Sequence, residues 1–168
     1  MATPATDYAA IFGASFAALG IRVADRFVVG IDFLPASITP LAPPRNSVAH
    51  LVCAQLLAYL DDPDFRFDLP LKLCGSAHQI RVWEAMRAIP RGAAMSYGSL
   101  ARKLGSSARA VGQACGRNPA PIVVPCHRVV AADGRLGGFM GGRADTSLAI
   151  KRWLLAHEGY PVEPGKPI

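Results

Sequence analysis

The chain has 168 residues, 51% of them hydrophobic, and a formal net charge of +6 at pH 7. This length suffices for one good core or two small lobes, and no uninterrupted apolar stretch approaches the roughly 20 residues of a membrane span. The N-terminus lacks the basic and apolar segments of a signal peptide, so we expect a soluble, cytoplasmic protein without a membrane partner. The positive charge suits a polyanionic partner such as nucleic acid, although many basic proteins bind none.

The cysteines stand at spacings that fit neither a short-spaced zinc motif nor a small disulfide scaffold, so we predict no metal site. They are Cys53, Cys74, Cys115 and Cys126. Apolar residues at helical spacing surround Cys53 and Cys115, which predicts that both thiols are buried as small hydrophobic groups. A reactive thiolate at Cys126 would need a reducing compartment, in agreement with a cytoplasmic location.

The N-terminal part, residues 1–73, is predicted to form a small β-sheet lobe with one helix. Residues 16–33 are rich in Phe, Val and Ile, and Asp25-Arg26 is a plausible turn between two strands. Apolar residues recur at helical spacing over residues 48–60, which predicts an amphipathic helix. The proline-rich and acidic segments on either side of that helix are predicted to be connectors.

The C-terminal part, residues 74–168, has a helical pattern and most of the chain's arginines. The segment Ser76-Ala77-His78-Gln79 has the form of a capping box at the start of a helix. Two short helices, predicted over residues 96–105 and 108–116, are separated by a glycine turn and match a helix-turn-helix. From spacing alone an ordinary helical hairpin fits at least as well. The predicted fold class is therefore α+β.

The segment Val124-Pro125-Cys126-His127-Arg128-Val129 places a thiol beside an imidazole within a run of β-branched residues. A thiolate is the strongest common protein nucleophile near neutral pH, and a neighbouring base is the usual means of producing one. Asn118-Pro119 precedes this segment, and a glycine-rich stretch over residues 133–138 follows it. A cysteine alone would fit a buried, inert thiol, but this surrounding motif favours a nucleophile.

The string from Asn118 to Val130, with Gly137-Gly138 behind it, resembles the O6-alkylguanine-DNA alkyltransferases (methylated-DNA–protein-cysteine methyltransferases). The resemblance extends less sharply over residues 75–159. It implies a two-lobed α+β fold whose helical C-terminal lobe carries a DNA-binding helix-turn-helix. It also implies DNA repair by irreversible transfer of an alkyl group from O6-alkylguanine in double-stranded DNA to Cys126, once per molecule and without a cofactor. O4-alkylthymine is a second candidate lesion, and we expect a monomer.

The same resemblance assigns roles to further side chains around the thiol. His127 acts as the base through a water molecule and is oriented by the Glu158 carboxylate. In an extended strand, neighbouring side chains point to opposite faces, so direct contact between Cys126 and His127 is not assured. Asn118 braces the turn before Cys126, and the Tyr97 hydroxyl donates to the departing guanine.

Residues 108–116 resemble the family's recognition helix, which enters the minor groove, and their small side chains permit close approach. Arg109 matches the arginine that fills the space left by an extruded base; without the resemblance, a solvated charge on the helix surface is the better reading. The residues predicted to meet DNA are Ala108, Arg109, Ala110, Gly112, Arg117 and Arg128. The residues predicted to line the substrate pocket are Pro121, Val129, Phe139 and Met140. The Val129 carbonyl would accept a hydrogen bond from the guanine amino group.

Two features depart from the family's pattern in this part of the chain. His78 stands where a phenylalanine is usual, and the segment from Arg143 to Ile150 is predicted to be an unusually long link to the closing helix. Two other functions stay open. One is a non-catalytic protein of the same superfamily that binds alkylated bases, a class in which the cysteine is replaced. The other is a cysteine hydrolase that uses Cys126, His127 and Glu158.

Overall fold

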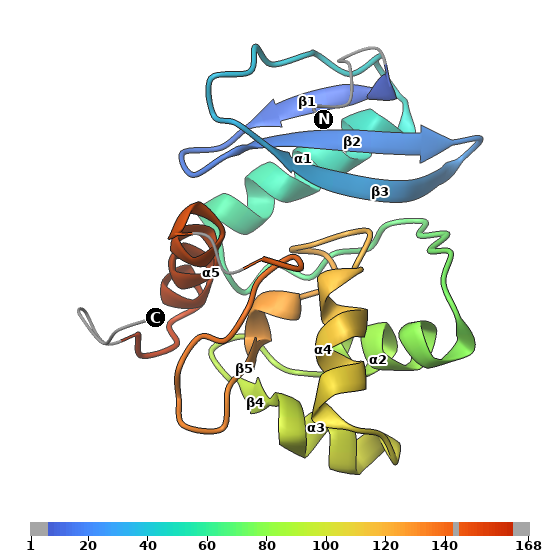
Figure 1. Cartoon of the computed structure of the whole chain (residues 1–168). Helices are drawn as coiled ribbons and strands as arrows, with labels where there is room; N and C mark the ends of the chain where they lie inside the picture. The colour runs from blue at the N-terminus through green and yellow to red at the C-terminus, as the bar shows by residue number, and fades with distance from the viewer. Residues whose placement is uncertain (1–6, 143–144, 163–168) are drawn as a thin grey trace. The chain divides into compact units, whose positions relative to one another are not determined.

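The computed structural model describes residues 7–142 and 145–162. The chain divides into two compact units, Met1–Cys74 and Gly75–Ile168 (Figure 1). No helix among the described residues has both the length and the apolar character to cross a lipid bilayer. Both α-helix and β-sheet are present, and the α+β fold class predicted from the sequence is confirmed.

A three-stranded antiparallel sheet in the order β1-β2-β3 forms the N-terminal unit. Its strands are β1 (Ala10–Gly13), β2 (Ala18–Ala24) and β3 (Phe27–Leu34). β2 and β3 form the expected hairpin, in which Ala24 pairs with Phe27 and Asp25 takes the turn conformation with φ 54°. A short aspartate tolerates this left-handed conformation better than most residues, which explains the turn at this position.

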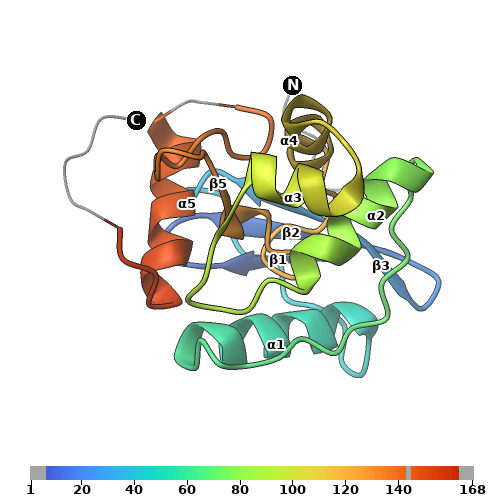
Figure 2. The ribbon, with the colours of Figure 1, turned by 90° about the horizontal axis from the view of Figure 1, so that it is seen from below.

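Helix α1 (Val48–Asp61) packs against this sheet (Figure 2). It begins at Ser47, whose hydroxyl accepts a hydrogen bond from the backbone amide of His50 at 3.1 Å. The side chains that it buries recur at helical spacing, as its sequence pattern predicts. They are Ala49, Val52, Leu56 and Tyr59.

Three helices pack side by side in the C-terminal unit (Figure 2). They are α2 (Ala77–Arg87), α3 (Tyr97–Leu104) and α4 (Ala108–Gly116). Both hydrogen bonds of the predicted capping box are present at Ser76 and Gln79. The indole nitrogen of Trp83 donates to the Ala114 carbonyl at 2.9 Å and so ties α2 to α4.

The turn between α3 and α4 is sharp because Gly105 ends α3 in the left-handed conformation, with φ 62°. Two residues later Ser107 caps α4 by accepting from the Ala110 amide at 3.1 Å. His78 forms a 2.8 Å hydrogen bond with the Ser106 hydroxyl. The residue that departs from the family's phenylalanine therefore fastens α2 to the turn of the helix pair.

The segment around the candidate nucleophile corrects one expectation from the sequence. Residues Cys126–Arg128 form a single 3-10 turn, and only then does the chain enter the short strand β5 (Val129–Val130), which pairs in parallel with β4 (Met95–Ser96). The opposite-face geometry expected of an extended Cys126-His127 pair is therefore wrong. The prolines before the cysteine favour this turn because proline restricts the backbone and donates no ladder hydrogen bond.

Helix α5 spans Asp145–His157. The prediction that Arg143 to Ile150 form a long link is wrong from residue 145 onward, because those residues already belong to the helix; residues 143 and 144 lie outside the described residues. Leu148 and Leu155 are fully buried and hold this longer helix in place. Gly159, with φ 81°, ends the helical turn that follows α5.

The Gly105 turn gives a direct test of the helix pair. Substitution Gly105→Ala should lower the free energy of unfolding by about 1 kcal/mol, because a Cβ there meets no atom within 4 Å and only the left-handed backbone is strained. Both tryptophans, Trp83 and Trp153, lie in this unit, so urea unfolding followed by tryptophan fluorescence reports it.

The matched control is Gly98→Ala inside α3. Its Cβ would meet its nearest neighbour at 3.7 Å, and alanine favours a helical backbone, so stability should rise by about 0.5 kcal/mol. Equal effects of the two substitutions would contradict the assignment of Gly105 as a conformational stop.

Candidate active site

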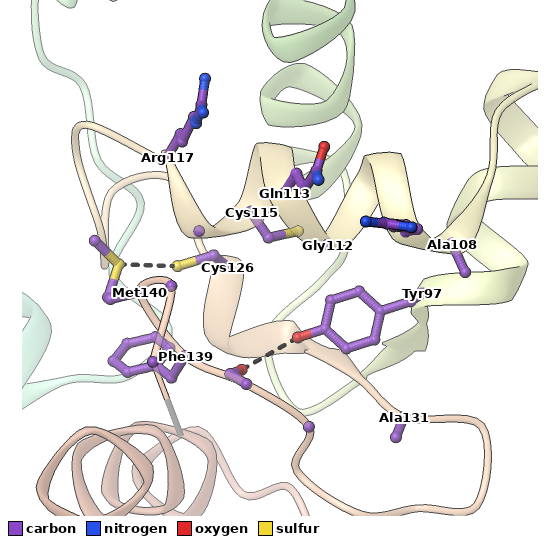
Figure 3. A pocket seen from close by; sticks show the side chains of 16 residues that line it. Tyr97, Ala108, Gly112, Gln113, Cys115, Arg117, Cys126, Ala131, Phe139 and Met140 are labelled. Atoms are coloured by element: carbon purple, nitrogen blue, oxygen red, sulfur yellow. Dashed lines mark hydrogen bonds between the residues drawn. The ribbon is translucent and has the colours of Figure 1, made fainter. Parts of the chain in front are cut away.

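A cavity of about 720 Å³ opens between helix α4 and the glycine-rich loop over residues 137–142 (Figure 3). Tyr97 from the start of α3 and Cys126 from the 3-10 turn also line it. Its size falls within the range of small-molecule sites. The candidate nucleophile thus faces a cavity that is bounded by the second helix of the helix-turn-helix.

The loop before the thiol is fixed by Asn118, which is buried with 3% exposure. Its side-chain amide donates to the Val124 carbonyl at 2.8 Å, and its side-chain oxygen accepts from the Ala120 amide at 3.1 Å. Ile122 adopts a positive φ of 74°, a conformation that a β-branched residue tolerates only when its surroundings enforce it. This bracing holds Cys126 in one place.

The thiol of Cys126 is 3% exposed, and its sulfur lies 3.7 Å from the Met140 sulfur (Figure 3). Burial raises the pKa of this thiol, and a hydrogen bond with Asn118 and the positive charge of Lys151 oppose that effect only in part. The sulfur therefore keeps its proton at neutral pH. It needs a base before it can act as a nucleophile.

His127, Arg128 and Glu158 form a buried network beside the thiol. The His127 Nε2 atom lies 2.9 Å from the Glu158 carboxylate, and the Arg128 guanidinium donates to both oxygens of that carboxylate at 2.8 Å. Burial alone would raise the pKa of Glu158, but the hydrogen bonds from His127 and Arg128 outweigh it and lower this pKa to about 2. The carboxylate is therefore ionised at neutral pH and can only accept hydrogen bonds.

This network fixes the tautomer of His127. Burial lowers the imidazole pKa despite the opposing hydrogen bond with Glu158, so the ring is neutral near pH 7. Because the Glu158 carboxylate can only accept, Nε2 carries the proton and Nδ1 keeps a free lone pair. Nδ1 is buried and has no hydrogen-bond partner among the described residues. The Nδ1 lone pair of His127 is therefore available to accept a proton.

Lys151 is a further polar residue at this site, and the sequence interpretation missed it. Its buried ammonium group donates to the carbonyls of Val129, Leu136 and Gly138 at 2.6, 2.5 and 2.9 Å. Burial lowers its pKa to about 8. The sequence feature that could have identified Lys151 is its position in α5, three residues after Leu148 and therefore on the face that the helix buries.

The hydroxyl of Tyr97 donates to the Gly138 carbonyl at 3.1 Å (Figure 3). The Lys151 ammonium group lies 5.7 Å from the centre of the tyrosine ring, within the range of a cation–π contact. Tyr97 and Lys151 thus converge on the same carbonyl of the glycine-rich loop. They hold that loop against α3 and α5.

The structure brings together most of the residues predicted for the pocket and the DNA surface. Those that line the cavity are Tyr97, Ala108, Arg109, Gly112, Arg117, Phe139 and Met140. Ala110, Pro121 and Val129 are not among its lining residues. Pro121 and Val129 are buried in the bracing loop and in β5, and the Val129 carbonyl accepts from Lys151, so their place in the substrate pocket stays a prediction.

Arg128, which was predicted to contact DNA, forms an ion pair inside the protein. Its guanidinium pairs with Glu158, and it also donates to the Ile89 carbonyl at 2.5 Å. Only 14% of the side chain is exposed, and its positive charge balances the buried Glu158 carboxylate. The cations that remain available at the cavity are Arg109 and Arg117, which are exposed.

The model of the 6-O-methylguanine DNA methyltransferase DNA-binding domain matches residues 77–160, which is half of the chain. The chain belongs to this family. It is 50% identical over 102 residues to a methylated-DNA–protein-cysteine methyltransferase of Mycolicibacterium paratuberculosis, and 53% identical over 88 residues to one of Salmonella typhimurium. These alignments cover 58% and 51% of this chain and 62% and 48% of the two relatives, so the chain spans only part of their length.

Other members of the methyltransferase family match more of the chain. The O6-methylguanine methyltransferase of Mycobacterium tuberculosis has a TM-score of 0.73 at 34% identity, covering 91% of this chain and 94% of that one. A complex of the mycobacterial protein with DNA gives a TM-score of 0.74 at 35% identity, over 89% and 91% of the two chains. A DNA base-flipping protein of Thermus thermophilus is 42% identical over 135 residues, which are 78% of this chain and 88% of that protein.

The buried carboxylate of this methyltransferase-family site predicts a pH-dependent stability. The pKa of Glu158 falls from 4.5 to about 2 on folding, so its contribution is present above pH 4.5 and is lost as the pH falls toward 2. Substitution Glu158→Gln should lower the free energy of unfolding at neutral pH by roughly 3 kcal/mol. The difference should shrink below pH 4.5, as measured by urea unfolding across the pH range.

The matched control is Glu84→Gln on the exposed face of α2, which should change stability by less than about 0.5 kcal/mol at any pH. A loss in Glu158→Gln that stays constant down to acid pH would argue against an ionised carboxylate as the stabilising species.

Proposed function

We propose that this chain repairs DNA by transferring the alkyl group of O6-alkylguanine irreversibly to Cys126. The observation that carries the proposal is a buried thiol at the wall of a cavity, next to a neutral histidine whose free Nδ1 is available as a base. Membership of the 6-O-methylguanine DNA methyltransferase family supports the same chemistry. The residue roles below are part of the proposal.

The reaction needs one bond to form and one to break. The Cys126 proton passes to Nδ1 of His127 through a water molecule, because the two side chains share no direct hydrogen bond within the described residues. The sulfur attacks the alkyl carbon, the carbon–O6 bond breaks, and guanine leaves with a proton returned from His127. The products are an S-alkyl cysteine and unmodified guanine, so the atoms balance without a cofactor.

Glu158, Arg128 and Asn118 act as positioning residues. Glu158 holds the tautomer that leaves Nδ1 free, Arg128 keeps Glu158 ionised, and Asn118 fixes the thiol. The thioether on Cys126 offers no easily hydrolysed bond, so each molecule reacts once. We also infer a reducing, cytoplasmic compartment, because a thiol that must remain free would be oxidised elsewhere.

The substrate reaches the thiol only if the damaged base leaves the helix stack. Extruding a base costs a few kcal/mol, and less for a base that pairs poorly. Helix α4 is suited to a minor groove because the small residues Ala108 and Gly112 let its backbone approach the DNA closely. The exposed Arg109 fills the gap in the base stack. Arg117 at the end of the helix neutralises phosphate charge.

A second candidate function is binding and flipping of alkylated bases without transfer. It is favoured by the base-flipping protein of Thermus thermophilus, whose alignment covers 88% of that relative. The intact Cys126 beside His127 and Glu158 favours transfer, because a protein that only binds needs neither a nucleophile nor a base. The two functions differ in whether a covalent product forms.

The direct test incubates the chain with a short duplex that carries one O6-methylguanine, followed by peptide mass mapping. Transfer predicts one methyl group on the peptide containing Cys126, in a yield that never exceeds one per protein molecule. The exposed Cys74 is an internal control and should stay unmodified. Substitution Cys126→Ala should abolish the product while duplex binding persists.

The other outcomes separate the alternatives. Tight binding of the lesion duplex without any adduct would favour the base-flipping function. Repeated turnover of a small ester or amide, with no dependence on DNA, would favour a cysteine hydrolase.

The protonation state of His127 predicts the pH dependence of transfer. Because burial lowers its pKa below 6.5, the free Nδ1 should persist to mildly acid pH, so the single-turnover rate should stay flat from about pH 8 to 6.5 and fall only below it. Substitution His127→Gln should slow transfer by at least roughly 100-fold. Its residual rate should rise with pH as the thiol ionises unaided. An unchanged rate in this variant would show that His127 is not the base.

A further inference from the structure

Helix α4 presents three rows of side chains with different chemistry. Val111, Ala114 and Cys115 are buried and form its packing face. A row of small residues, Ala108, Gly112 and Gly116, forms part of the cavity wall. At Gly116 an added Cβ would lie 3.0 Å from the Gly141 Cα, which explains why this position must stay small. The third row lies next to this row of small residues on the helix surface.

The third row consists of Arg109, Gln113 and Arg117, spaced every fourth residue and therefore on one face of α4. All three are exposed and line the mouth of the cavity. Among the described residues none of their side chains has a hydrogen-bond or ion-pair partner. Figure 3 shows Gln113 and Arg117 projecting from α4 on the side away from Tyr97.

The middle position of this row differs from its neighbours because Gln113 is neutral. Two cations are explained by phosphate charge and by the gap that an extruded base leaves. A neutral amide gains little from phosphates, but it offers donors and an acceptor in one plane. That combination is suited to reading base edges, and it lies between two side chains that would anchor the helix on DNA.

We propose that Gln113 is a specificity-determining residue that reads a G·C pair near the lesion through the minor groove. The inference rests on the proposed function, in which α4 lies in that groove. A·T pairs present only acceptors there, whereas G·C pairs add the guanine N2 amino donor. The Gln113 amide can donate to an acceptor and accept from that amino group at once, so only a G·C pair satisfies both of its ends.

The helix geometry limits where this pair lies. Gln113 stands one turn beyond Arg109, about 6 Å along the helix at about 1.5 Å per residue. Base pairs are stacked about 3.4 Å apart. With Arg109 filling the vacated position, the pair read by Gln113 is therefore within two steps of the lesion.

The test replaces guanine by inosine at each G·C pair within two steps on either side of one O6-methylguanine. Inosine removes only the N2 amino group. At one of these positions, inosine should lower the transfer rate at subsaturating protein by roughly tenfold. It should lower the affinity of the Cys126→Ala variant for the duplex by a similar factor. In Gln113→Met, which keeps the length and helix propensity but has no amide, the inosine and guanine duplexes should behave alike.

The control is Arg117→Gln, which should weaken binding to all duplexes by the same factor and reduce the salt dependence. Equal responses of the parent protein and Gln113→Met to inosine at every position would overturn the inference, even where methyl transfer to Cys126 proceeds. If the protein binds guanine duplexes more tightly than inosine duplexes, and only when Gln113 is present, the inference is supported. If no methyl group is transferred in the same experiment, the proposed chemistry is refuted. Failure to bind any duplex would refute both.

Discussion

The site depends on one buried negative charge, the carboxylate of Glu158. It lies just beyond the C-terminus of α5, where the helix dipole disfavours an anion, so its ionised form survives only through Arg128 and His127. Arg128 carries the connection further, because it also binds the Ile89 carbonyl at the end of α2. A single carboxylate thereby joins α5, the 3-10 turn and the segment that follows α2, and it selects the histidine tautomer on which the proposed activation of Cys126 depends. Removing it would leave the largely buried Arg128 cation without its counter-ion, which is more costly than losing a surface ion pair.

Helix α5 positions the glycine-rich loop and the turn that carries Cys126, although it lies outside the pair of helices α3 and α4. Lys151 and Glu158 are seven residues apart and so share one face of the helical segment. Lys151 joins the Gly138 carbonyl of the glycine-rich loop and the adjacent Leu136 carbonyl to the Val129 carbonyl of β5, and Glu158 holds the turn that carries Cys126. The spacing between the loop and the nucleophile is therefore set by two turns of a rigid helix. This arrangement explains why a loop of many glycines keeps a defined shape around its cavity.

Local signals in the sequence predicted the helices, their caps and the glycine stops, because each of these depends on a few neighbouring residues. The capping box at Ser76 and the left-handed Gly105 are examples. The motif around Cys126 likewise indicated the nucleophile and its histidine. Partners distant in the chain were harder to assign. The pairing of Arg128 with Glu158 was not predicted and Lys151 was overlooked, because the burial of a charge depends on tertiary packing that no local pattern specifies. The turn at Cys126 was misjudged for the related reason that β-branched residues favour strands on average but yield to the prolines around them.

In the proposed function Cys126 reacts only once, and the resting state of its thiol suits that role. Burial keeps Cys126 protonated, the Met140 sulfur lies against it, and its base is neutral but not in direct contact. Each of these conditions lowers the thiolate fraction available to small electrophiles and oxidants, whereas the exposed Cys74 has no such protection. A nucleophile that is consumed by its first reaction gains from low reactivity until a substrate fills the cavity. The structure therefore separates the two requirements: Asn118 and the Glu158 network keep the geometry ready, while burial keeps the sulfur unreactive.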